Sequence, residues 1–227
     1  DNLPPVERAR KKHGDWDIEA KGPLWGAEHF PIYTPTPTDL LASTRGHVFT
    51  TWDLKGKIRT AAKMRKGESF VSGCVWLGVP GRLYLLDEVH GGWGLDDSIK
   101  QFYRLLERTP ADAHYVEYKA MGPEFIRRLR EGTDGPRVSG VVRHNPKGSK
   151  EERAEGIQPN VLAGDIWRPN PLKVPWVSDW SSEIARTPAP PNDRGDTLVM
   201  AVERHPKRNT STVETRSGSK AFTFSWG

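Results

Sequence analysis

Cysteine is nearly absent from this chain of 227 residues, in which Cys74 is the single thiol. One cysteine excludes an internal disulfide and a zinc site built from cysteines. Apolar runs are short as well, and none approaches the roughly 18–20 residues that a membrane-spanning helix needs. The N-terminal sequence DNLPPVERARKKHGDW lacks the apolar core of a secretory signal. These absences exclude a disulfide-stapled secreted scaffold, a zinc finger and a transmembrane protein, and we expect a soluble intracellular protein.

Three common catalytic motifs are missing too. The pattern GxxxxGK[ST] does not occur, so the chain carries no Walker A loop for ATP. The GxSxG turn that presents a catalytic serine is absent. The seven histidines are scattered and show no HExxH spacing. The sequence therefore argues against an ATPase of this type, a serine hydrolase and a zinc hydrolase.

Positive charge is in excess, with 34 lysines and arginines against 29 aspartates and glutamates, a formal net charge of +5. Basic residues cluster at 55–66, 127–130, 143–153 and 204–208. Each cluster alone is more often a solvated face, but together they indicate a surface that follows the phosphates of a polyanion. The predicted phosphate contacts come from the first and third clusters: Lys55, Lys57, Lys63, Arg65, Lys66, Arg143, Lys147, Lys150 and Arg153.

The chain divides into three parts. Residues 1–44 are predicted to be an N-terminal linker or extension, because proline punctuates the connector Pro31–Asp39. Residues 209–227 form a Ser/Thr-rich tail that we expect to be mobile. Regular structure is predicted within residues 45–208, from period-2 and helical apolar patterns and their boundary residues.

The expected strands are His47–Leu54, Ser69–Val79, Arg82–Val89, His114–Met121, Arg137–Val142 and a short one near Asp165–Arg168. The expected helices are Leu95–Thr109, Pro123–Gly132, one containing SKEERAEGI, Ser178–Thr187 capped by Ser178, and Asp196–His205. This order predicts an α/β fold with a mixed sheet of five strands, or slightly more, flanked by helices. The ribonuclease H-like fold has this order, and its first strand lies centrally, beside the fourth.

Acidic residues stand in places where they are unusual. Asp53 ends an apolar strand, Glu117 lies inside a short one, and Asp193 and Asp196 open the last helix. Aspartate and glutamate are depleted in strands, and a buried carboxylate without compensation is costly. Mg²⁺ or Mn²⁺ between carboxylates would supply the compensation, and a third acid would complete a site for two ions roughly 3.5–4 Å apart. The alternative is that Asp53 and Glu117 are solvated residues at strand ends.

Six segments, taken in order, resemble the C-terminal nuclease domain of the large subunit of tailed-phage terminases. They span about residues 45–205, and the most specific are the E-x-K-x-x-G-x-x-x-I-x-x-L run and the K-x-x-R-A pair. The segments are TTWDLKGK (Thr50–Lys57), LYLLDEV (Leu83–Val89), YVEYKAMGPEFIRRLR (Tyr115–Arg130), KEERAEGI with GDIWRPN (Lys150–Asn170), WVSDWSSEIARTP (Trp176–Pro188) and NDRGDTLVMAV (Asn192–Val202).

The resemblance implies a ribonuclease H-like nuclease that uses two Mg²⁺ or Mn²⁺ ions to cut concatemeric viral DNA. It assigns the first catalytic and metal-binding acid to Asp53 and the second to Glu117. The third is Asp193 or Asp196, because the doubled aspartate of the family is broken here; Asp193 is slightly favoured. Supporting roles near the ligands fall to Asp87 and Lys119, and phosphate positioning falls to Lys150 and Arg153.

The resemblance also implies partners: double-stranded DNA, the terminase ATPase domain, the small terminase subunit and the portal, in the host cytoplasm and away from membranes. The family's ATPase domain is not in this sequence, and the segment Asn2–Thr38 resembles the linker that would join it. Two alternatives stay open. One is a Holliday-junction resolvase of the same fold, and the other is a catalytically silent module that binds DNA or docks on the motor.

Overall fold

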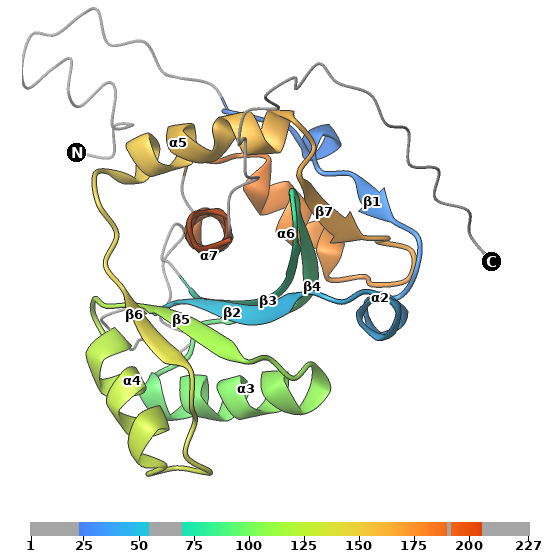
Figure 1. The fold of residues 1–227 in the computed structure, drawn as a ribbon. Helices are drawn as coiled ribbons and strands as arrows, with labels where there is room; N and C mark the ends of the chain where they lie inside the picture. The colour runs from blue at the N-terminus through green and yellow to red at the C-terminus, as the bar shows by residue number, and fades with distance from the viewer. Residues whose placement is uncertain (1–22, 55–69, 190–191, 206–227) are drawn as a thin grey trace, which may run out of the picture.

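The computed structural model describes residues 23–54, 70–189 and 192–205. A single mixed sheet of seven strands, in the order β1-β7-β4-β3-β2-β5-β6, runs through its centre with helices on both faces (Figure 1). The strands are β1 (Ile32–Tyr33), β2 (His47–Asp53), β3 (Val71–Val79), β4 (Arg82–Gly91), β5 (Ala113–Glu117), β6 (Val141–His144) and β7 (Ile166–Pro169). The helices are η1 (Ala27–His29), α2 (Pro37–Ser43), α3 (Leu95–Arg108), α4 (Gly122–Glu131), α5 (Lys150–Leu162), α6 (Val177–Ile184) and α7 (Asp193–Arg204).

The centre of the sheet is strand β2. It pairs antiparallel with β3 on one side and parallel with β5 on the other. Residues 48–53 of β2 are all buried, as expected of a strand covered by helices on both faces. In the expected numbering β2 is the first strand and β5 the fourth, so the prediction that these two lie side by side is confirmed.

Two layers of helices cover the sheet. Helices α3 and α4 lie on one face, and α5, α6 and α7 lie on the other (Figure 1). Helix α7 packs directly on β2 and β3, beneath α5. The predicted ribonuclease H-like α/β architecture is therefore confirmed, with a sheet slightly larger than five strands.

The segment predicted as a linker contributes to the fold. Strand β1 pairs parallel with β7 and adds an edge strand to the sheet. Trp25 and Phe30 are buried, and the Phe30 ring lies edge-on against Trp180 of α6. The indole nitrogen of Trp25 donates a hydrogen bond to the Ile184 carbonyl. Residues 23–44 thus belong to the packed structure, because their aromatic side chains fill a gap beside α6; the domain boundary at 44 stays a prediction.

Several boundaries differ from the sequence-based expectation. Helix α7 begins at Asp193, one turn earlier than predicted, and β6 lies at Val141–His144 instead of starting at Arg137. Ser178 does not cap α6, because the helix already begins at Val177 and its N-cap is Trp176. Residues 55–66 and 209–227, which carry a predicted DNA-binding segment and the tail, lie outside the described residues. None of the described helices is long and apolar enough to span a membrane.

Candidate metal centre

The two predicted strand acids meet at one end of the sheet. Trp52 of β2 pairs with Val116 of β5, and Asp53 and Glu117 follow them by one position. Because β2 and β5 are parallel, both acids lie at the same edge and point to the same face. The sequence places these carboxylates at strand ends, and the register brings them together.

A row of polar residues continues from these acids along that edge. Asp53 stands opposite Ser72 of β3, and Ser72 stands opposite His90 of β4. On the other side Glu117 stands opposite His144 of β6. Cross-strand partners share a face, so the five side chains form one row on the face that α7 covers. A row of five polar side chains is unusual in the interior of a sheet. It indicates that this edge of the sheet has a function.

Helix α7 brings a third carboxylate to Asp53 and Glu117. Asp196 lies in its first turn and is 4% exposed. Its charge raises the pKa of Asp53, and the charge of Glu117 in turn raises the pKa of Asp196. We call Asp53, Glu117 and Asp196 the acidic centre. All three come from different elements and are almost fully buried.

Helix α5 supplies the positive charges that face Asp196. Its capping box, between Ser149 and Glu152, starts the helix at Lys150. Lys150 Nζ forms an ion pair with Asp196 Oδ2, and Arg153 Nη2 donates to Asp196 Oδ1 at 3.1 Å. The Lys150 side chain is about half exposed, whereas that of Arg153 is 6% exposed.

The pKa values of Asp53 and Glu117 are shifted in opposite directions. Burial, the interaction with Glu117 and the charge of Asp196 raise the pKa of the Asp53 carboxyl well above its usual range. Burial also raises the pKa of Glu117, but its interaction with Asp53 and the charge of Lys119 outweigh burial and lower that pKa. The environment therefore favours the neutral form at Asp53 over the neutral form at Glu117.

The donor chemistry of the acidic centre fits a hard divalent cation. Burial raises the pKa of Asp196, whereas the charges of Lys150 and Arg153 lower it. The acidic centre brings together three carboxylates whose negative charge is costly to bury. Carboxylate oxygens are the ligands that Mg²⁺ and Mn²⁺ prefer. A divalent ion held by these oxygens would compensate the negative charge of the three carboxylates.

The remaining predicted residues fall in different places. Lys119 Nζ lies 3.4 Å from Glu117 Oε1, at the edge of the acidic centre. Asp87 points to the opposite face of the sheet, where it binds Arg108 and Thr109. The predicted supporting role of Asp87 is therefore not supported, because residues alternate between the two faces of β4.

The predicted phosphate contacts are only partly described. Arg143 and Lys147 are exposed, and the Arg143 guanidinium stacks on the Tyr118 ring at 5.7 Å from its centroid. Arg143 stands opposite Val116 of β5, so its side chain and that of Glu117 leave opposite faces of the sheet at the same edge. Lys55, Lys57, Lys63, Arg65 and Lys66 lie outside the described residues.

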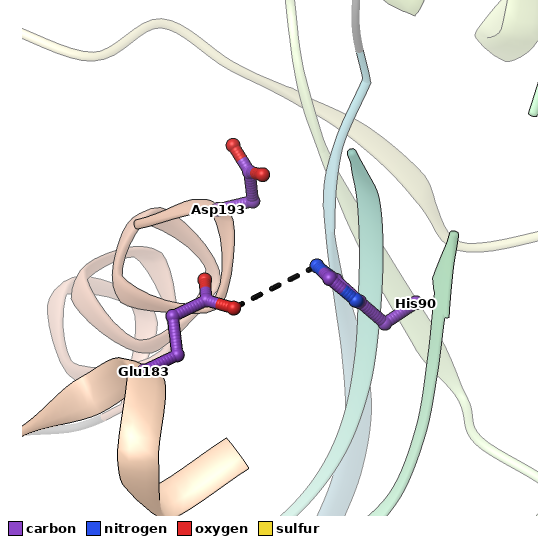
Figure 2. Close-up of side chains that lie close together, drawn as sticks. All are labelled: His90, Glu183 and Asp193. Atoms are coloured by element: carbon purple, nitrogen blue, oxygen red, sulfur yellow. Dashed lines mark ion pairs between the residues drawn. The ribbon is translucent and has the colours of Figure 1, made fainter. Parts of the chain in front are cut away.

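Asp193 belongs to a different group from Asp196. Its carboxylate, a Glu183 carboxylate oxygen from α6 and a ring nitrogen of His90 lie within 4.8 Å of one another (Figure 2). Asp193 Oδ2 also accepts a hydrogen bond from the Phe70 amide at 2.6 Å. Although the two aspartates are one turn apart on α7, they contribute to neighbouring but separate clusters.

Sequence reasoning missed a buried charge cluster beside Asp193. The Arg194 guanidinium binds Glu88 through Nε at 3.0 Å and Nη2 at 2.7 Å, and Glu183 through Nη1 at 3.1 Å. The signal that could have found it is the alternation of Glu88 and His90 in an otherwise apolar strand. Both positions face α7, so two polar side chains at spacing two predict a polar partner on the covering helix.

No protein-family model matches the chain, and no curated protein matches it. Solved structures do match, with low sequence identity. The nuclease domain of the large terminase g2p from bacteriophage SPP1, with bound Mn, has a TM-score of 0.54 at 15% identity, over 81% of this chain and 99% of that one. The large terminase nuclease from thermophilic phage G20c has a TM-score of 0.52 at 12% identity, over 82% and 100% of the two chains.

A viral relative outside the phages also matches. The human cytomegalovirus terminase nuclease domain, soaked with Mn and bound to an inhibitor, has a TM-score of 0.52 at 11% identity, over 78% of this chain and 92% of that one. The sheet order therefore defines an α/β protein of the ribonuclease H-like class. Within that class, the chain has the fold of the large terminase nuclease domains.

Proposed function

We propose that this chain is a metal-dependent endonuclease that cuts double-stranded DNA, with little sequence preference, during the packaging of a viral genome. The observation that carries the proposal is the acidic centre, in which three buried carboxylates from β2, β5 and α7 share one face of the sheet. The fold likeness supports it, since SPP1 and cytomegalovirus nuclease domains have been solved with Mn.

The acidic centre would hold two Mg²⁺ or Mn²⁺ ions. Asp53, Glu117 and Asp196 would supply the carboxylate oxygens that hold these ions. When bound, such ions lower the pKa of a water nucleophile and stabilise the charge that develops on the cleaved phosphate. Metal binding would favour the ionised form of Asp53, whose pKa is raised in the metal-free protein, because a carboxylate ligand must be deprotonated.

The third ligand is proposed to be Asp196 in place of Asp193. Asp196 interacts electrostatically with both Asp53 and Glu117, whereas Asp193 groups with His90 and Glu183. The slight preference for Asp193 from the sequence rests on the Asn192–Asp193 doublet. The position of α7 favours Asp196 instead. Because the helix begins at Asp193, Asp196 lies in its first turn and faces the strand acids Asp53 and Glu117.

The basic residues divide into two proposed roles. Lys150 and Lys119 are about half exposed or more and can exchange a carboxylate for a DNA phosphate. Arg153 is buried under Asp196, which supports a role in holding that carboxylate in place. Arg143 and Lys147 are exposed candidates for phosphate contacts farther along the duplex.

The proposed partners follow from the same role. They are double-stranded DNA, an ATPase motor domain, a small terminase subunit and the portal, acting in the host cytoplasm. Two other functions are less well supported. A junction resolvase would share the fold, and a silent docking module would not need three buried carboxylates on one face.

A plasmid-cleavage assay tests the proposal. We expect the chain to nick and linearise a supercoiled plasmid with Mn²⁺ or Mg²⁺ and to be inactive with EDTA. Asp53→Asn should abolish cleavage, and the matched control Asp97→Asn, on the exposed face of α3, should cut at the wild-type rate.

Two results would contradict this function. If Asp53→Asn cleaved the plasmid at the wild-type rate, the acidic centre would not be the catalytic site. Preference for a four-way junction over linear duplex, measured with the same protein, would favour the resolvase.

A further inference from the structure

A second group of possible metal ligands lies beside the acidic centre, on the same face of the sheet. His90 comes from the end of β4, Glu183 from α6 and Asp193 from the first turn of α7. One ligand atom from each lies within 4.8 Å of the other two. Figure 2 shows Glu183 and His90 directed toward each other, with Asp193 close beside them. The group shares no residue with the acidic centre.

The spacing of His90 and Glu183 suits two ligands of one ion. His90 Nε2 lies 3.8 Å from Glu183 Oε2, which is too long for a hydrogen bond. Two ligand atoms that each lie about 2.1 Å from a metal are separated by about 3.0–4.2 Å, depending on the angle between them. An ion could therefore bind both atoms with little movement of either side chain.

The surroundings hold the ligands in place. The His90 ring packs on Phe70, with centroids 5.0 Å apart, and the Phe70 amide donates to Asp193 Oδ2. Glu183 is fixed from the other side, because its Oε1 accepts the Arg194 amide at 2.9 Å and its Oε2 accepts Nη1. Preorganised ligands of this kind lose little conformational freedom when an ion binds.

The charge balance also favours a cation. Glu88 and Glu183 are both buried and share a single guanidinium, that of Arg194. A second positive charge next to Glu183 would balance the pair. Among the residues that the structure describes, a proton on His90 could supply that charge, and so could a metal ion between His90, Glu183 and Asp193.

We propose that His90, Glu183 and Asp193 form a second metal site, which takes a transition-metal ion such as Mn²⁺, Co²⁺ or Zn²⁺ in preference to Mg²⁺. The imidazole nitrogen decides this preference, since Mg²⁺ binds oxygen and the other three ions accept mixed nitrogen and oxygen ligands. The acidic centre, made only of carboxylates, does not discriminate in this way.

The proposed site would fasten three elements at the point where α7 begins. Asp196 follows Asp193 by one helical turn, so an ion on Asp193 would fix the part of α7 that carries the third acid of the acidic centre. The site is a positioning device and goes beyond the proposed nuclease function, because its ligands need not touch DNA.

Cobalt absorption spectroscopy tests the site without measuring cleavage. The full chain carrying Asp53→Asn, kept in excess Mg²⁺ at pH 8 to saturate oxygen-only sites, is titrated with Co²⁺. We expect one equivalent of Co²⁺ to give visible d–d bands and to raise the melting temperature, while Mg²⁺ alone does neither. His90→Ala should weaken Co²⁺ binding at least about tenfold.

Matched variants keep the test decisive. His47→Ala removes an exposed histidine from β2 and should leave the Co²⁺ titration unchanged. Glu183→Gln preserves the shape of the side chain and keeps one of the two acceptor oxygens that Arg194 uses, so it should fold and bind Co²⁺ more weakly even if His90→Ala is unstable. Two results would overturn the proposed site: equal Co²⁺ affinity in all variants, or no Co²⁺ binding in excess Mg²⁺. Either result would assign the positive charge beside Glu183 to a proton on His90. Neither result would bear on plasmid cleavage.

Discussion

At the scale of single residues, the acidic centre is governed by the cost of burying charge. Asp53 and Glu117 are both more than nine-tenths buried, and two adjacent carboxylates cannot both ionise cheaply without a cation. Burial and the neighbouring carboxylates accordingly raise the pKa of Asp53 well above its usual range. Asp196 has Lys150 and Arg153 as compensating partners.

Substitutions at Asp53 should separate its structural role from its chemistry. In metal-free buffer Asp53→Asn should be as stable as the wild type, because the amide can donate to Glu117 as the protonated acid does. Asp53→Ala removes that donor and should lower the free energy of unfolding by about 1–3 kcal/mol. Urea denaturation with EDTA measures both. Equal stability of the two variants would contradict a stabilising hydrogen bond from residue 53 to Glu117.

A buried histidine on the other face of the sheet predicts a pH dependence of stability. His114 is 2% exposed, shares a hydrogen bond with Thr50 Oγ1 at 3.0 Å and packs against Phe102. Burial lowers its pKa from 6.5 to about 4, although the charge of Asp112 acts in the opposite direction. The imidazole is therefore neutral in the folded state at pH values where it is charged in the unfolded chain.

The sign of the effect follows from that difference. Stability from neutral His114 is complete above about pH 6.5 and is lost as the pH falls toward 4, by at most about 3 kcal/mol. Urea unfolding at several pH values should show this loss in the wild type and a smaller loss in His114→Gln. The exposed control His47→Gln should behave as the wild type, and an unchanged slope in His114→Gln would refute the assignment.

At the scale of elements, helices α5 and α7 assemble the side chains that the sheet lacks. Helix α7 lies on β2 and β3, with α5 packed on it from outside (Figure 1). The start of α5 supplies Lys150 and Arg153, and the start of α7 supplies Asp193 and Asp196. The helix N-termini are therefore the parts whose position determines the geometry of both clusters.

The capping box of α5 should matter for that position. Ser149 Oγ accepts the Glu152 amide at 3.1 Å, and Glu152 Oε2 accepts the Ser149 amide at 2.7 Å. Ser149→Ala should lower the free energy of unfolding by about 1 kcal/mol and should reduce cleavage, because Lys150 and Arg153 follow directly. Denaturation and plasmid cutting measure the two effects. The control Ser182→Ala, on the exposed side of α6, should change neither, and full activity in Ser149→Ala would count against this role.

At the scale of the whole molecule, both faces of the sheet carry a packed apolar core, and one of them also carries the proposed chemistry. The face under α3 and α4 holds the cluster of Trp52, Phe102, Phe125 and their neighbours. The opposite face ends in the polar row from His144 to His90. A duplex would therefore approach the edge where β2 and β5 end, near the exposed basic residues of β6 and the loop after it.

DNA binding should depend on those basic residues in a way that salt reveals. Arg143→Ala with Lys147→Ala should weaken duplex binding about equally for all sequences and reduce the slope of log K against log salt by about 1–2. Binding is measured in EDTA so that cleavage does not interfere. The matched variant Arg104→Ala, on α3, should leave the slope unchanged. An unchanged slope would show that Arg143 and Lys147 do not contact DNA phosphates, and it would favour the segment 55–66 as the DNA-binding surface.

The sequence by itself determined the order of elements and the two strand acids. Period-2 runs of β-branched and aromatic residues predicted β2, β3 and β4, and Asp53 and Glu117 stood out because carboxylates are rare in such runs. These features are local, so propensity and spacing were sufficient. The ribonuclease H-like arrangement then followed from the alternation of helices and strands, and the structure confirms it.

Only the tertiary structure decided which acids meet. Asp193 and Asp196 share the first turn of α7, and no local pattern says that one faces Glu117 and the other His90 and Glu183. Asp87 and Glu88 are adjacent in sequence, yet their side chains lie on opposite faces of the sheet. Asp87 binds Arg108 on one face, and Glu88 binds Arg194 on the other. Strand register and the docking of α6 and α7 on the sheet set these contacts, because they join residues that are far apart in the chain.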